Sequence, residues 1–136
     1  MVIETLNWMH ATQGIEQIVV PVTFPVASSQ QLIDAVATAL AREAEGAVKI
    51  CVFSHISSMP TLIEPVAELA ALCHRYNAVV LVDGAHAPGV LDIDVHSIGA
   101  DYYTGNCHKW LYAPKVLAHC LLVWLFVCFP YRIHSK

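Results

Sequence analysis

Short apolar runs alternate along this chain with segments whose apolar residues recur at helical spacing, and this alternation constrains the fold most. Residues 48–54 (VKICVFS) and 78–82 (AVVLV) are short, mostly apolar and rich in β-forming residues, as expected of buried strands. Residues 101–106 (DYYTGN) predict another short strand. Residues 17–22 (QIVVPV) predict a strand at a sheet edge, because Pro21 lacks a backbone donor.

Helices are predicted in the intervals between these strands. Ser28 and Gln31 form a capping-box pattern, and the apolar stripe that follows continues until Gly46. A second helix is predicted from Pro65 to about Tyr76, with apolar residues along one face. This order of elements predicts an α/β fold with a parallel sheet and right-handed crossovers.

Polar side chains follow three of the predicted strands, at the point where each strand ends. They are Ser54, His55, Ser57 and Ser58 after the first, Asp83 and His86 after the second, and Asn106, His108 and Lys109 after the third. Ligands of open α/β sheets bind beyond the carboxyl ends of the strands. The sequence therefore predicts that these side chains converge on one crevice.

An acid, histidines and a lysine at one sheet edge are the groups that a pyridoxal phosphate site requires. The lysine amine forms a Schiff base with the aldehyde, a carboxylate keeps the ring nitrogen protonated, and neutral donors hold the phosphate. Lys109, Asp83 and the pair Asn106 and His108 would fill these roles. Alone, such an Asp is usually a turn former and such a Lys an exposed cation, but their placement at successive strand ends favours a site.

Two stretches carry a resemblance to a known family. Residues 79–115 (VVLVDGAHAPGVLDIDVHSIGADYYTGNCHKWLYAPK) resemble the core of the class V, fold type I aminotransferases, and residues 53–66 (FSHISSMPTLIEPV) resemble the preceding strand and loop. Within the family the chain is most similar to plant L-cysteine desulfhydrases and isopenicillin N epimerase-like proteins. The resemblance implies that residues 1–115 are part of the pyridoxal-phosphate-binding large domain, while the apolar tail 116–136 matches nothing in the family.

The resemblance implies a role for each residue of the lysine side. Lys109 is similar to the Schiff-base lysine, which later acts as the base at the substrate α-carbon. Asp83 matches the carboxylate paired with the pyridine nitrogen, and His86 matches the residue that hydrogen-bonds the 3-oxygen of the ring.

The resemblance also implies phosphate-side and substrate-side residues. Asn106 and His108 match the phosphate-side positions. His55 and Ser58 lie in the loop that faces the substrate in relatives. The upstream phosphate cup and the C-terminal arginine of the family have no counterpart here, so we expect a truncated fragment that does not turn over cysteine alone.

The implied activity is the α,β-elimination of cysteine to pyruvate, ammonia and sulfide by a homodimeric enzyme acting on an amino acid. An epimerase or aminotransferase of the same family is an alternative, and so is a non-catalytic fragment that pairs with full-length relatives. A cysteine desulfurase using Cys107 fits less well, because in that subfamily the sulfur-accepting cysteine lies on a later loop. A metal site at Asp92, Asp94 and His96 would need these residues on one strand face, and a solvated loop is the simpler interpretation, so no metal is expected.

Charge and cysteine usage narrow the setting. A formal net charge of -4, with no run of Lys or Arg, argues against nucleic acid as a partner. The odd number of cysteines, five, with no CxxC pair, and an N-terminus unlike a secretory signal predict a reducing, cytoplasmic location. The apolar stretch 116–129 contains 14 residues, fewer than the roughly 20 that span a bilayer, so a membrane helix is not expected.

Overall fold

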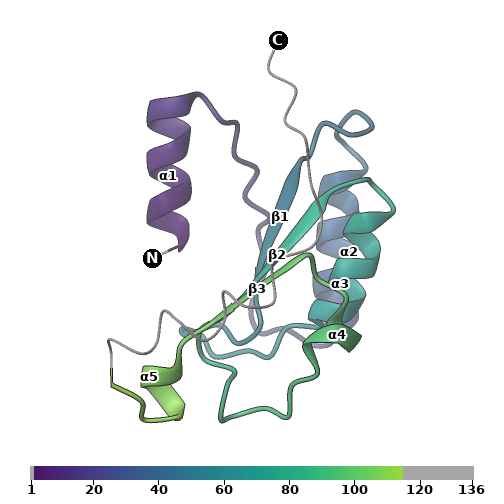
Figure 1. Ribbon diagram of the computed structural model, residues 1–136. Helices are drawn as coiled ribbons and strands as arrows, with labels where there is room; N and C mark the ends of the chain where they lie inside the picture. The colour runs from purple at the N-terminus through teal and green to yellow at the C-terminus, as the bar shows by residue number, and fades with distance from the viewer. Residues whose placement is uncertain (1, 115–136) are drawn as a thin grey trace.

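The computed structural model describes residues 2–114, which form a small parallel sheet with helices around it (Figure 1). The elements, in chain order, are α1 (Val2–Gln13), α2 (Ser29–Leu40), β1 (Ile50–Ser54), α3 (Val66–His74), β2 (Val79–Gly84), α4 (Val95–Ile98), β3 (Tyr102–Gly105) and α5 (Cys107–Trp110). The predicted α/β class with a parallel sheet is confirmed. The apolar tail 116–136 lies outside the described residues.

The sheet has the order β1-β2-β3, and both strand pairs are parallel. Ser54 pairs with Asp83 in the register of β1 and β2, and Asp83 pairs with Thr104 in the register of β2 and β3. The carboxyl ends of all three strands therefore lie at one edge of the sheet, where α5 follows β3 (Figure 1).

The strand predicted for residues 17–22 is wrong, because these residues form no strand, and the outer strands of the sheet in the described residues are β1 and β3. The segment has β-forming side chains, but it is poorly buried: Val19 is 75% exposed. Its Pro21 also removes a donor that a ladder would use. Without burial, β-propensity alone does not make a strand.

The helix predicted after Ser28 forms, but its start differs from a capping box. Ser28 is the N-cap without a side-chain bond to the helix. The Gln31 side chain instead accepts from the Ala27 N–H at 3.0 Å and donates to the Thr23 carbonyl at 2.9 Å. Gln31 therefore ties the incoming chain to the helix rather than closing the reciprocal pair.

The core lies between the sheet and helices α2 and α3. Val80 and Val82 of β2 are fully buried, and they pack with Leu69 and Cys73 of α3. Because strand side chains alternate, Asp83 points to the opposite face. That is the side on which α1 stands in Figure 1.

One carboxylate ties the start of β3 to β2 and α3. Asp101 Oδ2 accepts from the Val80 N–H at 2.8 Å and lies 2.9 Å from His74 Nε2. The contact with a backbone N–H of β2 fixes how far β3 is advanced along its neighbour. Within residues 2–114, no helix has the length and apolar character needed to cross a membrane.

Candidate active site at the carboxyl end of the sheet

Lys109 and His86 meet beyond the ends of β3 and β2. Lys109 lies on the short helix α5, which begins directly after Asn106. His86 lies in the tight turn after β2, where the Ala87 N–H donates to the Gly84 carbonyl at 2.9 Å. Lys109 Nζ is 3.0 Å from His86 Nε2, and both side chains are half-buried. Two of the residues singled out in the sequence are therefore in direct contact.

Trp110 contacts the other side of the same imidazole. Its Nε1–H donates to His86 Nδ1 at 3.4 Å, and the two rings lie with centroids 6.4 Å apart at an interplanar angle of 56°. Trp110 had no predicted role. Its position next to the lysine was the only signal that could have suggested one.

Asp83 lies at the end of β2 and lines a cavity of about 550 Å³ between α1 and the sheet. Its Oδ1 accepts from the Ala85 N–H at 3.0 Å, which orients the carboxylate at the strand end. Ser54, Ser57 and Glu64 also line this cavity. The wall near Asp83 is therefore polar, whereas residues from α1 and the segment after it make the opposite wall mostly apolar.

Glu64 is a candidate that the sequence analysis missed. Burial raises the pKa of its carboxyl to about 7, against a backbone hydrogen bond from Ser54 that lowers it. A carboxyl with this pKa can exchange a proton near neutral pH, which is unusual for Glu. Its position just before Pro65 suggested only the start of a helix.

His55 and Tyr103 form a buried pair on the helix-facing side of the sheet. His55 Nδ1 is 2.8 Å from the Tyr103 hydroxyl oxygen, and the rings meet edge to face. Burial, followed by the charge of Asp83, raises the pKa of Tyr103 to about 12, and burial lowers the pKa of His55. Both side chains are therefore neutral near pH 7, and His55 is only 9% exposed.

Gly84 makes room for this pair. A Cβ at Gly84 would overlap the ring and hydroxyl of Tyr103. Gly84 thus allows the Tyr103 ring to lie flat over the end of β2 and reach His55, 48 residues away in sequence. The close approach joins the ends of β1 and β3 across β2.

The other predicted site residues are placed less closely together. Asn106 is the N-cap of α5 but its side chain makes no capping bond. His108 Nδ1 is buried without a hydrogen-bond partner among the described residues. Ser58 is exposed in the loop after β1, where its carbonyl accepts from the Thr61 hydroxyl at 3.2 Å. This contact lies within the loop after β1.

The metal hypothesis does not match the local structure. Residues 92–96 form no strand, so they do not share a strand face. Asp94 instead caps α4, accepting from the N–H groups of His96 at 3.0 Å and Ser97 at 3.3 Å. Among residues 2–114, no three His, Cys, Asp or Glu side chains are grouped to hold a metal ion.

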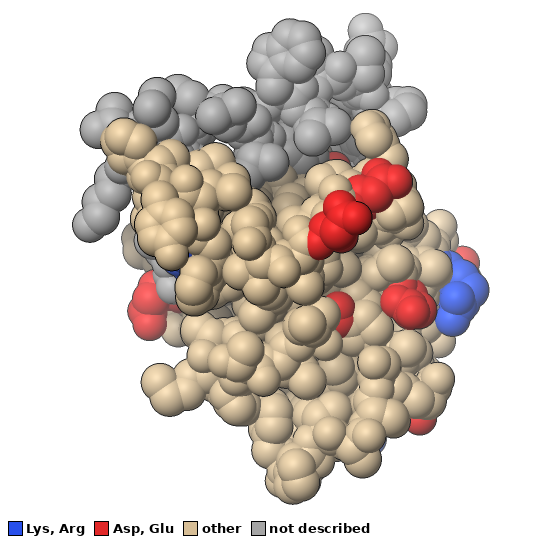
Figure 2. All heavy atoms as spheres, turned by 90° about the horizontal axis from the view of Figure 1, so that it is seen from below, with Lys and Arg blue, Asp and Glu red and all other residues tan. Residues whose placement is uncertain are grey.

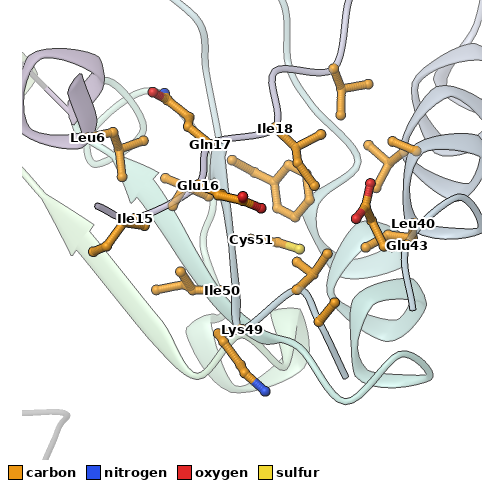
Figure 3. Close-up of a pocket in the computed structure, with 17 residues that line it drawn as sticks. Leu6, Ile15, Glu16, Gln17, Ile18, Leu40, Glu43, Lys49, Ile50 and Cys51 are labelled. Atoms are coloured by element: carbon orange, nitrogen blue, oxygen red, sulfur yellow. The ribbon is translucent and has the colours of Figure 1, made fainter. Parts of the chain in front are cut away.

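A second cavity, of about 380 Å³, lies beside the outer strand β1 (Figure 3). Its labelled residues include Cys51, Glu16 and Glu43, and it contains none of the predicted site residues. The face seen from below carries scattered acidic side chains on a mostly uncharged surface (Figure 2). Lys109, His86 and Asp83, the residues predicted to do acid–base and carbonyl chemistry, lie instead at the ends of β2 and β3.

Comparison with known proteins decides the family of this site. Residues 7–117 match the family described as aminotransferase class-V. The chain belongs to the class-V aminotransferases. It is 40% identical over 119 residues to the putative L-cysteine desulfhydrase 2 of Oryza sativa subsp. japonica, covering 82% of this chain and 25% of that protein. It is also 41% identical over 98 residues to the L-cysteine desulfhydrase of Arabidopsis thaliana, covering 70% and 22%.

This class-V chain spans about a quarter of the length of the curated relatives it matches. Among solved structures it is similar to SspA in complex with cysteine, with a TM-score of 0.64 and 20% identity over 84% of this chain and 30% of that one. The apo cysteine desulfurase of Thermococcus onnurineus NA1 gives a TM-score of 0.64 and 19% identity, over 82% and 26%. These likenesses support the fold of the class-V chain.

Proposed function

We propose that this chain carries the lysine side of a pyridoxal 5′-phosphate site that acts on an amino acid. The observation that supports the proposal is the 3.0 Å contact between Lys109 Nζ and His86 Nε2 at the ends of adjacent parallel strands. Asp83 lies near the end of β2, just before the turn that carries His86. An amine, an imidazole and a carboxylate at one sheet edge are the groups that this cofactor uses.

The residues present fit the cofactor. Lys109 would hold its aldehyde carbon covalently, and Asp83 would face the ring nitrogen. His108 Nδ1 is a buried polar atom without a partner in the described part of the chain, and a phosphate oxygen would satisfy it. Asn106, whose side chain makes no capping bond, would supply a second neutral donor. When bound, pyridoxal phosphate supplies an electron sink for the α-carbon of an amino acid.

The protein's own groups then position and move protons. Lys109 Nζ would take the proton from the substrate α-carbon, and His86 would hold that nitrogen in place at hydrogen-bond distance. Asp83, held by the Ala85 N–H, would keep a negative charge beside the ring nitrogen. The buried pair of His55 and Tyr103 would fix the sheet edge on which these groups stand.

The reaction we propose is α,β-elimination from L-cysteine. Its support is the identity of 40–41% to proteins named L-cysteine desulfhydrase. An epimerase is a second candidate, because the chain is 50% identical over 62 residues to the isopenicillin N epimerase of Streptomyces clavuligerus, covering 46% of this chain and 16% of that protein. Sulfide release separates the two activities, since an epimerase changes only the configuration of the α-carbon.

The proposal is tested by covalent trapping. The 136-residue chain is mixed with pyridoxal 5′-phosphate, reduced with borohydride and mapped by mass spectrometry. We expect the pyridoxyl group on Lys109 and its loss in Lys109→Ala. Lys49→Ala is the matched control, because the Lys49 amine donates to the Gly46 carbonyl at 2.6 Å, outside this site. Labelling spread equally over Lys49 and Lys109 would refute a built site.

We expect cofactor attachment without turnover in the 136-residue chain. Correct orientation of reacting groups is worth about 7–11 kcal/mol of barrier, and the chain spans about a quarter of its curated relatives. Sulfide release from L-cysteine should therefore stay at the level of free pyridoxal phosphate. Release well above that level, lost in Lys109→Ala, would contradict this expectation.

A further inference from the structure

We propose that Trp110 is a positioning residue that fixes the tautomer of His86, so that His86 offers an N–H at Nε2 to the amine of Lys109. The inference rests on the proposed function, because it concerns how readily Lys109 reacts with an aldehyde. It assigns a role to a residue outside the predicted lysine, carboxylate and phosphate groups.

The contact with Trp110 determines which nitrogen of His86 accepts a hydrogen bond. The indole Nε1–H of Trp110 can only donate a hydrogen bond. It lies 3.4 Å from His86 Nδ1, a long contact, and the two rings are tilted at 56° with centroids 6.4 Å apart. His86 Nδ1 must therefore carry the lone pair.

The same contact places the proton of the imidazole. A neutral imidazole has one N–H, so when Nδ1 accepts, the proton lies on Nε2. His86 Nε2 is 3.0 Å from Lys109 Nζ. An ammonium group has no lone pair with which to accept, whereas a free amine has one. Both contacts of His86 are satisfied when Lys109 is the uncharged amine, the form that attacks a carbonyl carbon.

Backbone packing, and not the hydrogen bond alone, brings Trp110 to His86. A Cβ at Gly89 would lie 3.0 Å from Leu111 Cδ2 and 3.2 Å from both the carbonyl carbon and the oxygen of Trp110. The loop that carries His86 therefore packs directly on the backbone at the end of α5. The Ala113 N–H also donates to the Cys107 carbonyl at 3.1 Å, which holds the segment after α5 against the start of that helix.

The test begins with the tautomer of His86 in the ¹⁵N-labelled 136-residue chain. Long-range proton–nitrogen correlation spectra distinguish the two ring nitrogens, and His86→Gln identifies the His86 signals by their loss. We expect the Nε2–H form in the wild type and a shift toward Nδ1–H in Trp110→Phe, which keeps an aromatic ring but lacks the donor. Trp8→Phe is the matched control, because Trp8 is 59% exposed on α1.

The second readout is the rate at which pyridoxal 5′-phosphate and borohydride label Lys109. Trp110→Phe should slow labelling about fivefold, the factor that corresponds to one net hydrogen bond. In a His86→Gln background the carboxamide offers an N–H without any tautomer, so Trp110→Phe should have no effect there. A purely structural Trp110 would slow labelling equally in both backgrounds.

These outcomes decide the inference independently of the cofactor. An Nδ1–H wild type, or a tautomer unchanged in Trp110→Phe, would overturn it, as would equal slowing in the two backgrounds. If no variant is labelled on Lys109 while the tautomer shifts as expected, the proposed function fails and the positioning role of Trp110 stands.

Discussion

Replacing Gly84 with alanine should destabilise this chain more than the addition of one methyl group suggests. A Cβ at Gly84 would overlap the Tyr103 ring, which is 2% exposed and held by its hydrogen bond to His55. Accommodating it means moving a packed ring, which costs about 1–3 kcal/mol, and losing a hydrogen bond worth about 1 kcal/mol. We therefore expect Gly84→Ala to lower the free energy of unfolding by about 2–4 kcal/mol.

Urea unfolding measures this loss directly. Gly46→Ala provides the contrast, because Gly46 has a φ of +68° but no atom within 4 Å of the added Cβ. Gly46→Ala should lower the free energy of unfolding by about 1–2 kcal/mol through backbone strain alone. In a Tyr103→Ala background the ring is gone, and Gly84→Ala should become nearly neutral. An equal cost of Gly84→Ala with and without Tyr103 would refute the overlap as its cause.

Two further substitutions test the environments of single carboxyl groups. Burial raises the folded-state pKa of Glu64 to about 7 from an ordinary 4.5, so its stabilising contribution is complete below pH 4.5 and is lost as the pH rises to about 7. In the wild type the urea midpoint should therefore fall as the pH rises from 4.5 to about 7. Glu64→Gln should remove this pH dependence, whereas Glu68→Gln on the exposed side of α3 should keep it. The same pH dependence in both variants would contradict the assignment to Glu64. Asp94→Ala should cost about 1 kcal/mol of stability by removing the cap of α4. Stabilisation of the wild type by added Zn²⁺ or Mg²⁺, lost in Asp94→Ala, would instead favour a metal role.

The sequence was informative where burial and periodicity agree. The runs that became β1, β2 and β3 are rich in β-forming residues, and β2 alternates fully buried with partly buried side chains. Their parallel order then predicts which polar residues share an edge. That rule places His86 and Lys109 at one edge, where their side chains are found 3.0 Å apart. Residues 17–22 have similar composition, but they form no strand, and Ile18 and Val19 are exposed. Composition does not distinguish the two cases.

Contacts that depend on register and side-chain direction could not be predicted. His55 was expected to face a substrate, yet its ring is buried against Tyr103, a partner set by three strands lying side by side. Glu64 was missed because its burial depends on the cavity wall that it lines rather than on the residues next to it in the sequence. Trp110 looked like an ordinary aromatic residue until the turn after β2 was seen to bring His86 against it.

The contact of Asp101 with the Val80 N–H, at the start of β3, influences the site at the carboxyl end of the same strand. A slip of β3 by one residue would move Lys109 by about 3.3 Å and turn each strand side chain to the other face. Such a slip would require the hydrogen bond from the Val80 N–H to Asp101 to break. Asp101 therefore fixes the register of β3, and through it the spacing between Lys109 and His86, from the opposite end of the strand. A substitution at Asp101 would change that spacing without altering either side chain.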